Sequence, residues 1–319
     1  MGSSIRDNLF AIVTLTAALL ARAHSSGVLQ GSPRLDAAVF AHAIQPGEVV
    51  RLDVTCACVS TPPTATVFAS HVALAPIPGG VLWRGWIGID LETKPGMYPV
   101  NVRVGQPPIT TTVALDVHAK RFLTRRLRVA DGLVNPPVSA LTRIAREAAQ
   151  LEALFKVVTP AVWDAPFLPP VMDSVIRNFG VRSIFNGQLR NPHAGIDFRS
   201  PADAPVAAPG PGRVVLADDL FFTGRTVVID HGLGLYSVLA HLSRIAVADG
   251  DRVQRGAIVG LVGATGRVTG PHLHWAVRLN GARVDPLSLL VALHAASADP
   301  PGPSGLNGPT PSPSVHSRR

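Results

Sequence analysis

The chain of 319 residues is longer than one typical domain and leaves room for two domains and tails. Its hydrophobic content of 47% and charged content of 16% exclude a largely disordered chain. The formal net charge of +8 favours contact with polyanions, but no dense lysine and arginine stripe with interleaved aromatic residues is present, so we expect no nucleic-acid partner.

The N-terminus has the layout of a secretory signal peptide, which we place at residues 1–23. A short segment containing Arg6 precedes an almost wholly apolar run, Leu9–Leu20, and Ala21-Arg22-Ala23 then offers a cleavage site of small residues. The apolar run is shorter than the roughly 20 residues that a membrane-spanning helix needs. We therefore expect export to the periplasm or cell envelope, with a membrane anchor as the alternative if the signal peptide is not cleaved.

Residues 28–118 predict a small accessory domain of the β-sandwich class. Apolar residues alternate with polar ones in Val49–Val54, Val100–Val104 and Thr112–Val117, and Pro-Gly pairs mark turns between the short strands. Strands that recur every eight to twelve residues or so are typical of a sandwich.

This first domain contains no catalytic constellation. The histidines His42, His71 and His118 are isolated from one another, and we expect surface or structural roles for them. Cys56 and Cys58 are separated by one residue, so a bridge between them would be strained. We expect these two cysteines to be small, half-buried core residues.

A connector at 119–165 joins this domain to a second one. Within it, Val138–Phe155 has apolar residues at helical spacing between flanking prolines, which predicts a helix that acts as a spacer. Residues 166–292 return to short strands separated by Gly-rich turns, so the whole protein is predicted to be mainly β. The stretch 295–319 is rich in Pro, Ser and Gly and predicts a disordered tail.

A pair of histidines separated by one residue, His272 and His274, occurs in the second domain. Successive side chains on a strand point to opposite faces, so these two imidazoles share one face while Leu273 points into the core. The His-x-His pattern alone is a weak signal.

His193 and Asp197 strengthen that signal. Zinc binds imidazole nitrogen and carboxylate oxygen, and a catalytic site has three protein ligands and an open fourth position. Two neutral histidines and one aspartate leave the ion with a net positive charge, which lowers the pKa of a bound water toward neutrality.

A zinc-bound water also needs a base, and that base must be a histidine or an aspartate because no glutamate follows Glu152. His272 shares its strand face with His274, and His241 lies at the end of another apolar segment. A pair of histidines can carry the proton from water to the leaving amine.

The stretch from about Phe179 to Pro286 resembles the lysostaphin-type, or LytM-type, zinc endopeptidases of peptidoglycan. The matching runs are Phe179-Gly180, His193-Ala-Gly-Ile-Asp197, Val227-Val-Ile-Asp-His-Gly-Leu-Gly234, Ala240-His-Leu-Ser243 and Gly263-Ala-Thr-Gly-Arg-Val-Thr-Gly-Pro-His-Leu-His274. Two positions depart from the family pattern, Leu239 in place of a frequent Tyr and Trp275-Ala276 in place of Phe-Glu.

The resemblance implies a compact antiparallel β fold with a groove over a single Zn2+ ion. It implies that His193, Asp197 and His274 bind the ion and that His241 and His272 are the catalytic histidines. It also implies cleavage of peptidoglycan stem or cross-bridge peptides, which would be the partners of the protein.

The groove itself is less defined by the sequence, and Arg182, Asn186 and Arg190 are weak candidates to line it. The alternative to an enzyme is a catalytically silent LytM-like protein that binds the wall or activates an amidase. Such relatives typically lack one or more metal ligands, whereas all three are present here.

Overall fold

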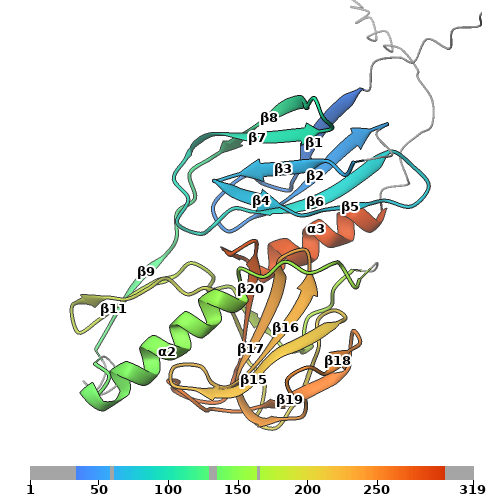
Figure 1. Ribbon diagram of the computed structural model, residues 1–319. Helices are drawn as coiled ribbons and strands as arrows, with labels where there is room; N and C mark the ends of the chain where they lie inside the picture. The colour runs from blue at the N-terminus through green and yellow to red at the C-terminus, as the bar shows by residue number, and fades with distance from the viewer. Residues whose placement is uncertain (1–33, 58–60, 129–134, 164–165, 299–319) are drawn as a thin grey trace, which may run out of the picture. The chain divides into compact units, whose positions relative to one another are not determined.

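A computed structural model describes residues 34–57, 61–128, 135–163 and 166–298 (Figure 1). The expected signal peptide, its alternative as an anchor, and residues 299–319 of the expected tail lie outside the described residues. Among the helices that are described, none is both long and apolar enough to cross a membrane. The described chain is mainly β, as predicted.

The N-terminal domain consists of two antiparallel four-stranded sheets, which confirms the predicted β-sandwich (Figure 1). One sheet has the order β1-β2-β6-β5 and the other β4-β3-β7-β8. The strands are β1 (Leu35–Phe40), β2 (Val49–Cys56), β3 (Thr64–Val67), β4 (Ser70–Val72), β5 (Leu74–Pro76), β6 (Leu82–Gly88), β7 (Gly96–Val104) and β8 (Ile109–Val117).

The core of this sandwich follows from the alternation in the sequence. Val50, Leu52 and Val54 of β2 are fully buried, as are Val100 and Val102 of β7 in the other sheet. Residues two apart on a strand share one face, so each sheet presents an apolar face to its partner.

Cys56 is disulfide-bonded, so the expectation of unbridged cysteines was wrong. That expectation assumed one strand running through both cysteines, with both side chains on the same face. Strand β2 ends at Cys56, ahead of the second cysteine in the sequence.

The connector contributes a strand and a helix to the second domain. Strand β9 (Thr124–Leu127) pairs in parallel with β11 (Arg182–Phe185), and α2 spans Val138–Leu154. The predicted helix is therefore present within the connector between the two domains, and it packs on the second of them. Its apolar face, including Leu151, packs on the sheet around Tyr236 because the outer face of that sheet is itself apolar.

A ten-stranded antiparallel sheet forms the second domain, with the path β10-β13-β20-β17-β16-β15-β18 and the strands β14, β19 and β21 attached to it. Strands β12, β11 and β9 form a separate small sheet. The remaining bounds are β10 (Val175–Ile176), β12 (Gln188–Leu189), β13 (Gly195–Phe198), β14 (Pro205–Ala207), β15 (Gly212–Leu220), β16 (Gly224–Gly232), β17 (Leu235–Ile245), β18 (Arg252–Val253), β19 (Ile258–Val262), β20 (Leu273–Leu279) and β21 (Ala282–Val284).

The core of this sheet continues into the sandwich, and both domains belong to one compact unit. Val49 and Trp86 of the sandwich join the buried cluster of the second domain. The Val49 backbone N–H donates to Ser288 Oγ at 2.9 Å, and Arg283 donates to Asp90 at 2.7 Å. The two domains are therefore held together by apolar packing and by partly buried polar contacts.

Helix α3 (Pro286–Ala298) follows the last strand and was not predicted. Leu289 and Leu293 on this helix are buried in the shared core. The second domain was expected to end at residue 292 and the tail to begin at 295, whereas the helix continues to Ala298. Its run of apolar residues has no clear helical periodicity, because the helix is apolar around most of its circumference.

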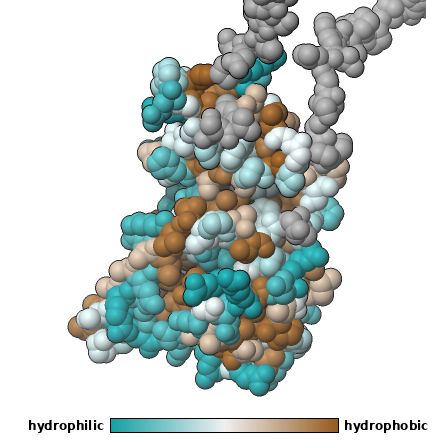
Figure 2. All heavy atoms as spheres, turned by 45° about the vertical axis from the view of Figure 1, so that its right-hand side comes forward, coloured by the Kyte–Doolittle hydropathy of each residue, from teal (hydrophilic) through white to brown (hydrophobic). Residues whose placement is uncertain are grey.

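Apolar residues are also present on the surface, but they are not gathered into one broad face. Figure 2 shows hydrophobic and hydrophilic residues interspersed on the side that it displays. The exposed large hydrophobic residues come from all parts of the described chain, among them Met97, Leu123, Val138, Met172 and Leu189.

Candidate active site

Strand pairing brings Asp197 and His274 together. Strands β13 and β20 are antiparallel neighbours, and their register places Asp197 directly opposite His274. Directly opposed residues of an antiparallel pair point to the same face of the sheet. His274 Nδ1 consequently lies 2.9 Å from Asp197 Oδ1.

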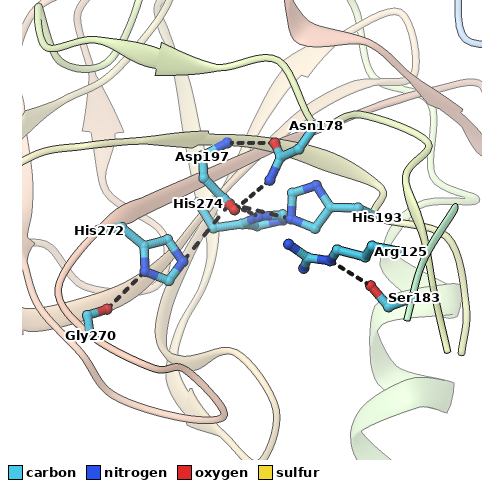
Figure 3. A network of polar contacts seen from close by, with 8 residues as sticks. All are labelled: Arg125, Asn178, Ser183, His193, Asp197, Gly270, His272 and His274. Atoms are coloured by element: carbon cyan, nitrogen blue, oxygen red, sulfur yellow. Dashed lines mark hydrogen bonds and ion pairs between the residues drawn. The ribbon is translucent and has the colours of Figure 1, made fainter. Parts of the chain in front are cut away.

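His193 completes a three-residue cluster at the entrance to β13. Its Nε2 lies 3.3 Å from Asp197 Oδ1, and its ring centroid is 4.7 Å from that of His274. One ligand atom from each of the three residues lies within 4.8 Å of the other two. Figure 3 shows both imidazoles directed at the carboxylate.

The electrostatics of the cluster suit a metal ligand set. Burial by itself would raise the pKa of the Asp197 carboxyl, but hydrogen bonds from His193 and His274 outweigh it and hold this pKa far below its usual range. Burial also lowers the pKa of His274. An ionised carboxylate beside a neutral imidazole has the protonation that metal binding requires. The donor set of two nitrogens and one oxygen fits zinc.

Asn178 holds the carboxylate in place and was missed by the sequence analysis. Its Nδ2 donates to Asp197 Oδ2 at 2.7 Å, and its Oδ1 accepts from the Asp197 backbone N–H at 3.2 Å (Figure 3). The second carboxylate oxygen, Oδ1, is thereby left to face the histidines. Asn178 immediately precedes the Phe179-Gly180 run, but its contact with Asp197 depends on the pairing of β10 with β13, which leaves no local pattern in the sequence.

His272 lies on the same side of the sheet as His274, as the strand alternation predicted. Its Nε2 is 3.9 Å from Asp197 Oδ1, while Leu273 between the two histidines is fully buried. The other ring nitrogen, Nδ1, donates to the Gly270 carbonyl at 2.9 Å. Because a carbonyl oxygen only accepts, the proton of a neutral ring sits on Nδ1 and Nε2 is left as an acceptor that faces the cluster.

His241 approaches from β17, and its ring centroid lies 4.9 Å from that of His272. Its backbone adopts a left-handed conformation with φ of 66°, which is uncommon for a residue other than glycine. The ring is fixed by Nδ1, which donates to the Thr265 carbonyl at 2.9 Å. Burial, with a contribution from His274, lowers the pKa of His241 to about 3, so the imidazole is neutral at pH 7.

Comparisons with known proteins point to one family. The model of peptidase family M23 matches residues 191–286. Over 94 residues the chain is 45% identical to the peptidoglycan DD-endopeptidase ShyA of Vibrio cholerae, and over 97 residues it is 41% identical to the DD-carboxypeptidase/endopeptidase Mpg of Neisseria meningitidis. Each alignment covers 30% of this chain and 22% of the relative, so the chain spans about a fifth of the length of these relatives.

A solved structure matches much more of the chain. A crystal structure from Pseudomonas aeruginosa, of a protein assigned to peptidase M23, is 35% identical, with a TM-score of 0.62. The match covers 78% of this chain and 96% of that one. The chain belongs to peptidase family M23. This confirms the resemblance to lysostaphin-type and LytM-type peptidases at the level of the family.

A cavity of about 960 Å³ opens over the cluster in this M23 family member. All five histidine and aspartate candidates line it, together with Asn178. Three arginines also line it, namely Arg125, Arg199 and Arg267. Among the described residues, none of those that line the cavity comes from the sandwich.

The three weak groove candidates, Arg182, Asn186 and Arg190, do not line this cavity. They belong to the β11–β12 hairpin and its continuation, and Arg190 donates to Gln188. The arginine that the small sheet contributes to the cavity is instead Arg125, which comes from β9.

The remaining histidines considered from the sequence lie away from the cavity. His42, His71 and His118 are exposed residues of the sandwich domain. His231 is fully buried, where its Nδ1 donates to the Pro211 carbonyl and its Nε2 accepts from Ser237 Oγ. These contacts confirm a structural role for His231 in this M23 family member.

Proposed function

We propose that this protein is a zinc-dependent endopeptidase that hydrolyses peptide bonds in the stem or cross-bridge peptides of peptidoglycan. We further propose that it acts after export, in the periplasm or cell envelope, on the basis of the expected signal peptide. The names of the relatives ShyA and Mpg support an activity of this class. The convergence of His193, Asp197 and His274 on one wall-lining cluster of the cavity carries the proposal.

In this proposal His193, Asp197 and His274 hold one zinc ion. When bound, the ion supplies Lewis-acid chemistry that activates water and polarises the scissile carbonyl. Asn178 keeps Asp197 Oδ1 turned toward the two imidazoles through its own pair of hydrogen bonds. The cavity that these residues line, of about 960 Å³, is the place for the substrate peptide in this proposal.

His272 and His241 are assigned the proton transfers. The Nε2 atoms of both rings are free to accept, because each Nδ1 donates to a backbone carbonyl. A neutral imidazole beside the cluster takes the proton of the attacking water at Nε2 and returns it to the leaving amine. The left-handed backbone of His241 is a local strain of the kind that persists where the surrounding structure enforces it.

The test measures zinc content and the release of soluble fragments from purified peptidoglycan, before and after treatment with a chelator. We expect chelation to abolish release and added zinc to restore it. His193→Ala, Asp197→Ala and His274→Ala are expected to lose both metal and activity. His241→Ala is expected to keep zinc and lose turnover by about 10²–10⁴-fold.

His118→Ala is the matched control, since it changes an exposed histidine outside the cavity and should leave zinc and activity unchanged. Mass analysis of the fragments identifies the bond that is cut through the new amine and carboxyl ends. Release that survives chelation, or a fully active His274→Ala protein, would overturn the proposal. A protein that binds zinc but releases no fragments would favour the catalytically silent alternative.

A further inference from the structure

The cavity wall carries an excess of positive charge. Among the described residues that line it, the only carboxylate is that of Asp197, which is engaged by the histidines and by Asn178, whereas three arginines line the wall. Within the part of the chain that the structure describes, none of these arginines has an acidic side chain within ion-pair distance. Other arginines of the chain are paired with carboxylates, among them Arg34, Arg84, Arg143 and Arg283.

Of the three arginines, Arg125 has the side chain whose position is best defined by its contacts. It lies on β9, where the parallel register with β11 places it beside Ser183. Its Nε donates to Ser183 Oγ at 2.9 Å. Figure 3 shows the guanidinium group extending toward the side of the cluster where His193 lies. With Nε occupied, the two Nη groups remain as the end that can bind a carboxylate with two parallel hydrogen bonds.

Other residues of the wall add further polar groups. Arg199 follows β13, and its neighbour Ser200 is only 4% exposed, with an Oγ that has no hydrogen-bond partner among the described residues. Arg267 lies over the ring of Phe222 at 4.5 Å, in the loop between β19 and β20. A buried hydroxyl without a partner costs free energy unless a ligand or water satisfies it.

We propose that this cavity selects an acidic peptide, one that carries a free carboxylate beside the scissile bond, and that Arg125 binds this carboxylate. The proposal rests on the proposed function and names a specificity determinant for it. Arg199 and Arg267 add to the positive field that attracts the peptide, while Arg125 supplies the directional contact. Arginine suits this task because its planar fork matches a carboxylate, whereas a lysine offers only a point charge.

The test compares two synthetic cross-linked stem peptides that differ only in having free carboxylates or carboxamides beside the scissile bond. We expect the zinc-loaded protein to cleave the acidic peptide with a kcat/KM at least 10-fold above that of the amide. Arg125→Gln should remove this preference by raising KM for the acidic peptide far more than KM for the amide, with the larger effect on KM than on kcat. Arg125→Lys should restore part of the preference.

Arg126→Gln is the matched control. Arg126 is the next residue of the same strand, so its side chain points to the opposite face, and it does not line the cavity. It should retain the full preference for the acidic peptide. Thermal unfolding of all three variants shows whether each one folds, and raising the salt concentration should weaken the preference of the unaltered protein.

Calorimetric binding of both peptides to zinc-loaded His241→Ala separates this inference from the proposed function. Suppose that the unaltered protein cleaves neither peptide, but that the acidic peptide binds more tightly than the amide and loses this advantage when Arg125→Gln is added. The proposed function then fails and the carboxylate site stands. If both peptides are cleaved equally well by the unaltered protein and by Arg125→Gln, the carboxylate site is overturned and the endopeptidase stands. Equal loss in Arg125→Gln and Arg126→Gln would also overturn it.

Discussion

Replacing Asn178 by alanine should loosen the metal site without removing a ligand. The change deletes two hydrogen bonds to Asp197. In one, Asn178 Nδ2 donates to Asp197 Oδ2 at 2.7 Å, and in the other, Asn178 Oδ1 accepts from the Asp197 backbone N–H at 3.2 Å. A hydrogen bond to a charged group contributes about 1.5–3 kcal/mol. Loss of an outer partner of a metal ligand typically weakens metal affinity by about 10–100-fold. We therefore expect the zinc dissociation constant to rise by about 10–100-fold, equivalent to about 1.4–2.7 kcal/mol.

A competition titration against a chromophoric chelator measures this constant directly. Asn178→Asp should weaken zinc binding at least as much, because it exchanges the donor for a second negative charge beside Asp197. Asn101→Ala makes the same substitution at an exposed position of β7 in the sandwich and should bind zinc like the unaltered protein. If Asn178→Ala binds zinc as tightly as that control, the positioning role assigned to Asn178 is refuted.

The remaining predictions concern stability and the shape of the site. Burial lowers the pKa of His231 to about 4, below the 6.5 of an unfolded chain, so the unfolded state binds the proton first and stability should fall by roughly 3 kcal/mol as the pH drops from 6.5 to 4. Urea unfolding between pH 6.5 and pH 4 should show a smaller loss of stability for His231→Gln than for the unaltered protein. An identical loss in both proteins would contradict the assignment of this pH dependence to His231. Gly195→Ala should lose zinc, because a Cβ there would lie 2.5 Å from the Trp275 carbonyl and 2.8 Å from the His274 ring; zinc content measured on folded protein decides this. Trp275→Ala should reduce the free energy of unfolding by about 3–5 kcal/mol, because this side chain is fully buried and donates to Ser237. Calorimetric unfolding measures this change, and a decrease in the free energy of unfolding of less than about 1 kcal/mol would be inconsistent with the packing of Trp275 described above.

Much of the fold could be predicted because alternation along a strand is a local signal. The sandwich strands and the shared face of His272 and His274 both follow from residues two apart. Helix α2 was predicted for the same reason, from apolar residues at helical spacing. The apolar face of α2 did not show what it would cover, because that depends on the outer face of a sheet built from residues much later in the chain.

The parts of the site that were missed depend on long-range pairing. Asn178 reaches Asp197 because β10 pairs with β13, and Arg125 reaches the cavity because β9 pairs with β11. Neither pairing leaves a local pattern, since β10 has only two residues and β9 only four. His193, Asp197 and His274 were assigned as ligands because their motifs resemble those of the LytM-type peptidases, and that resemblance does not depend on knowing which strands bring the motifs together.

The path of the chain through β9 bears on how this protein can be cut or recombined. The segment that matches the family model begins at residue 191, so an excised fragment with that boundary would carry His193, Asp197 and His274. It would lack both Asn178 and the Arg125 side of the cavity. Exchange of such a fragment between relatives should therefore transfer the ligand set but leave substrate preference with the recipient, whose own linker builds the neighbouring wall. Variation in that linker, which lies outside the segment matched by the family model, offers a route by which one scaffold acquires different substrate preferences.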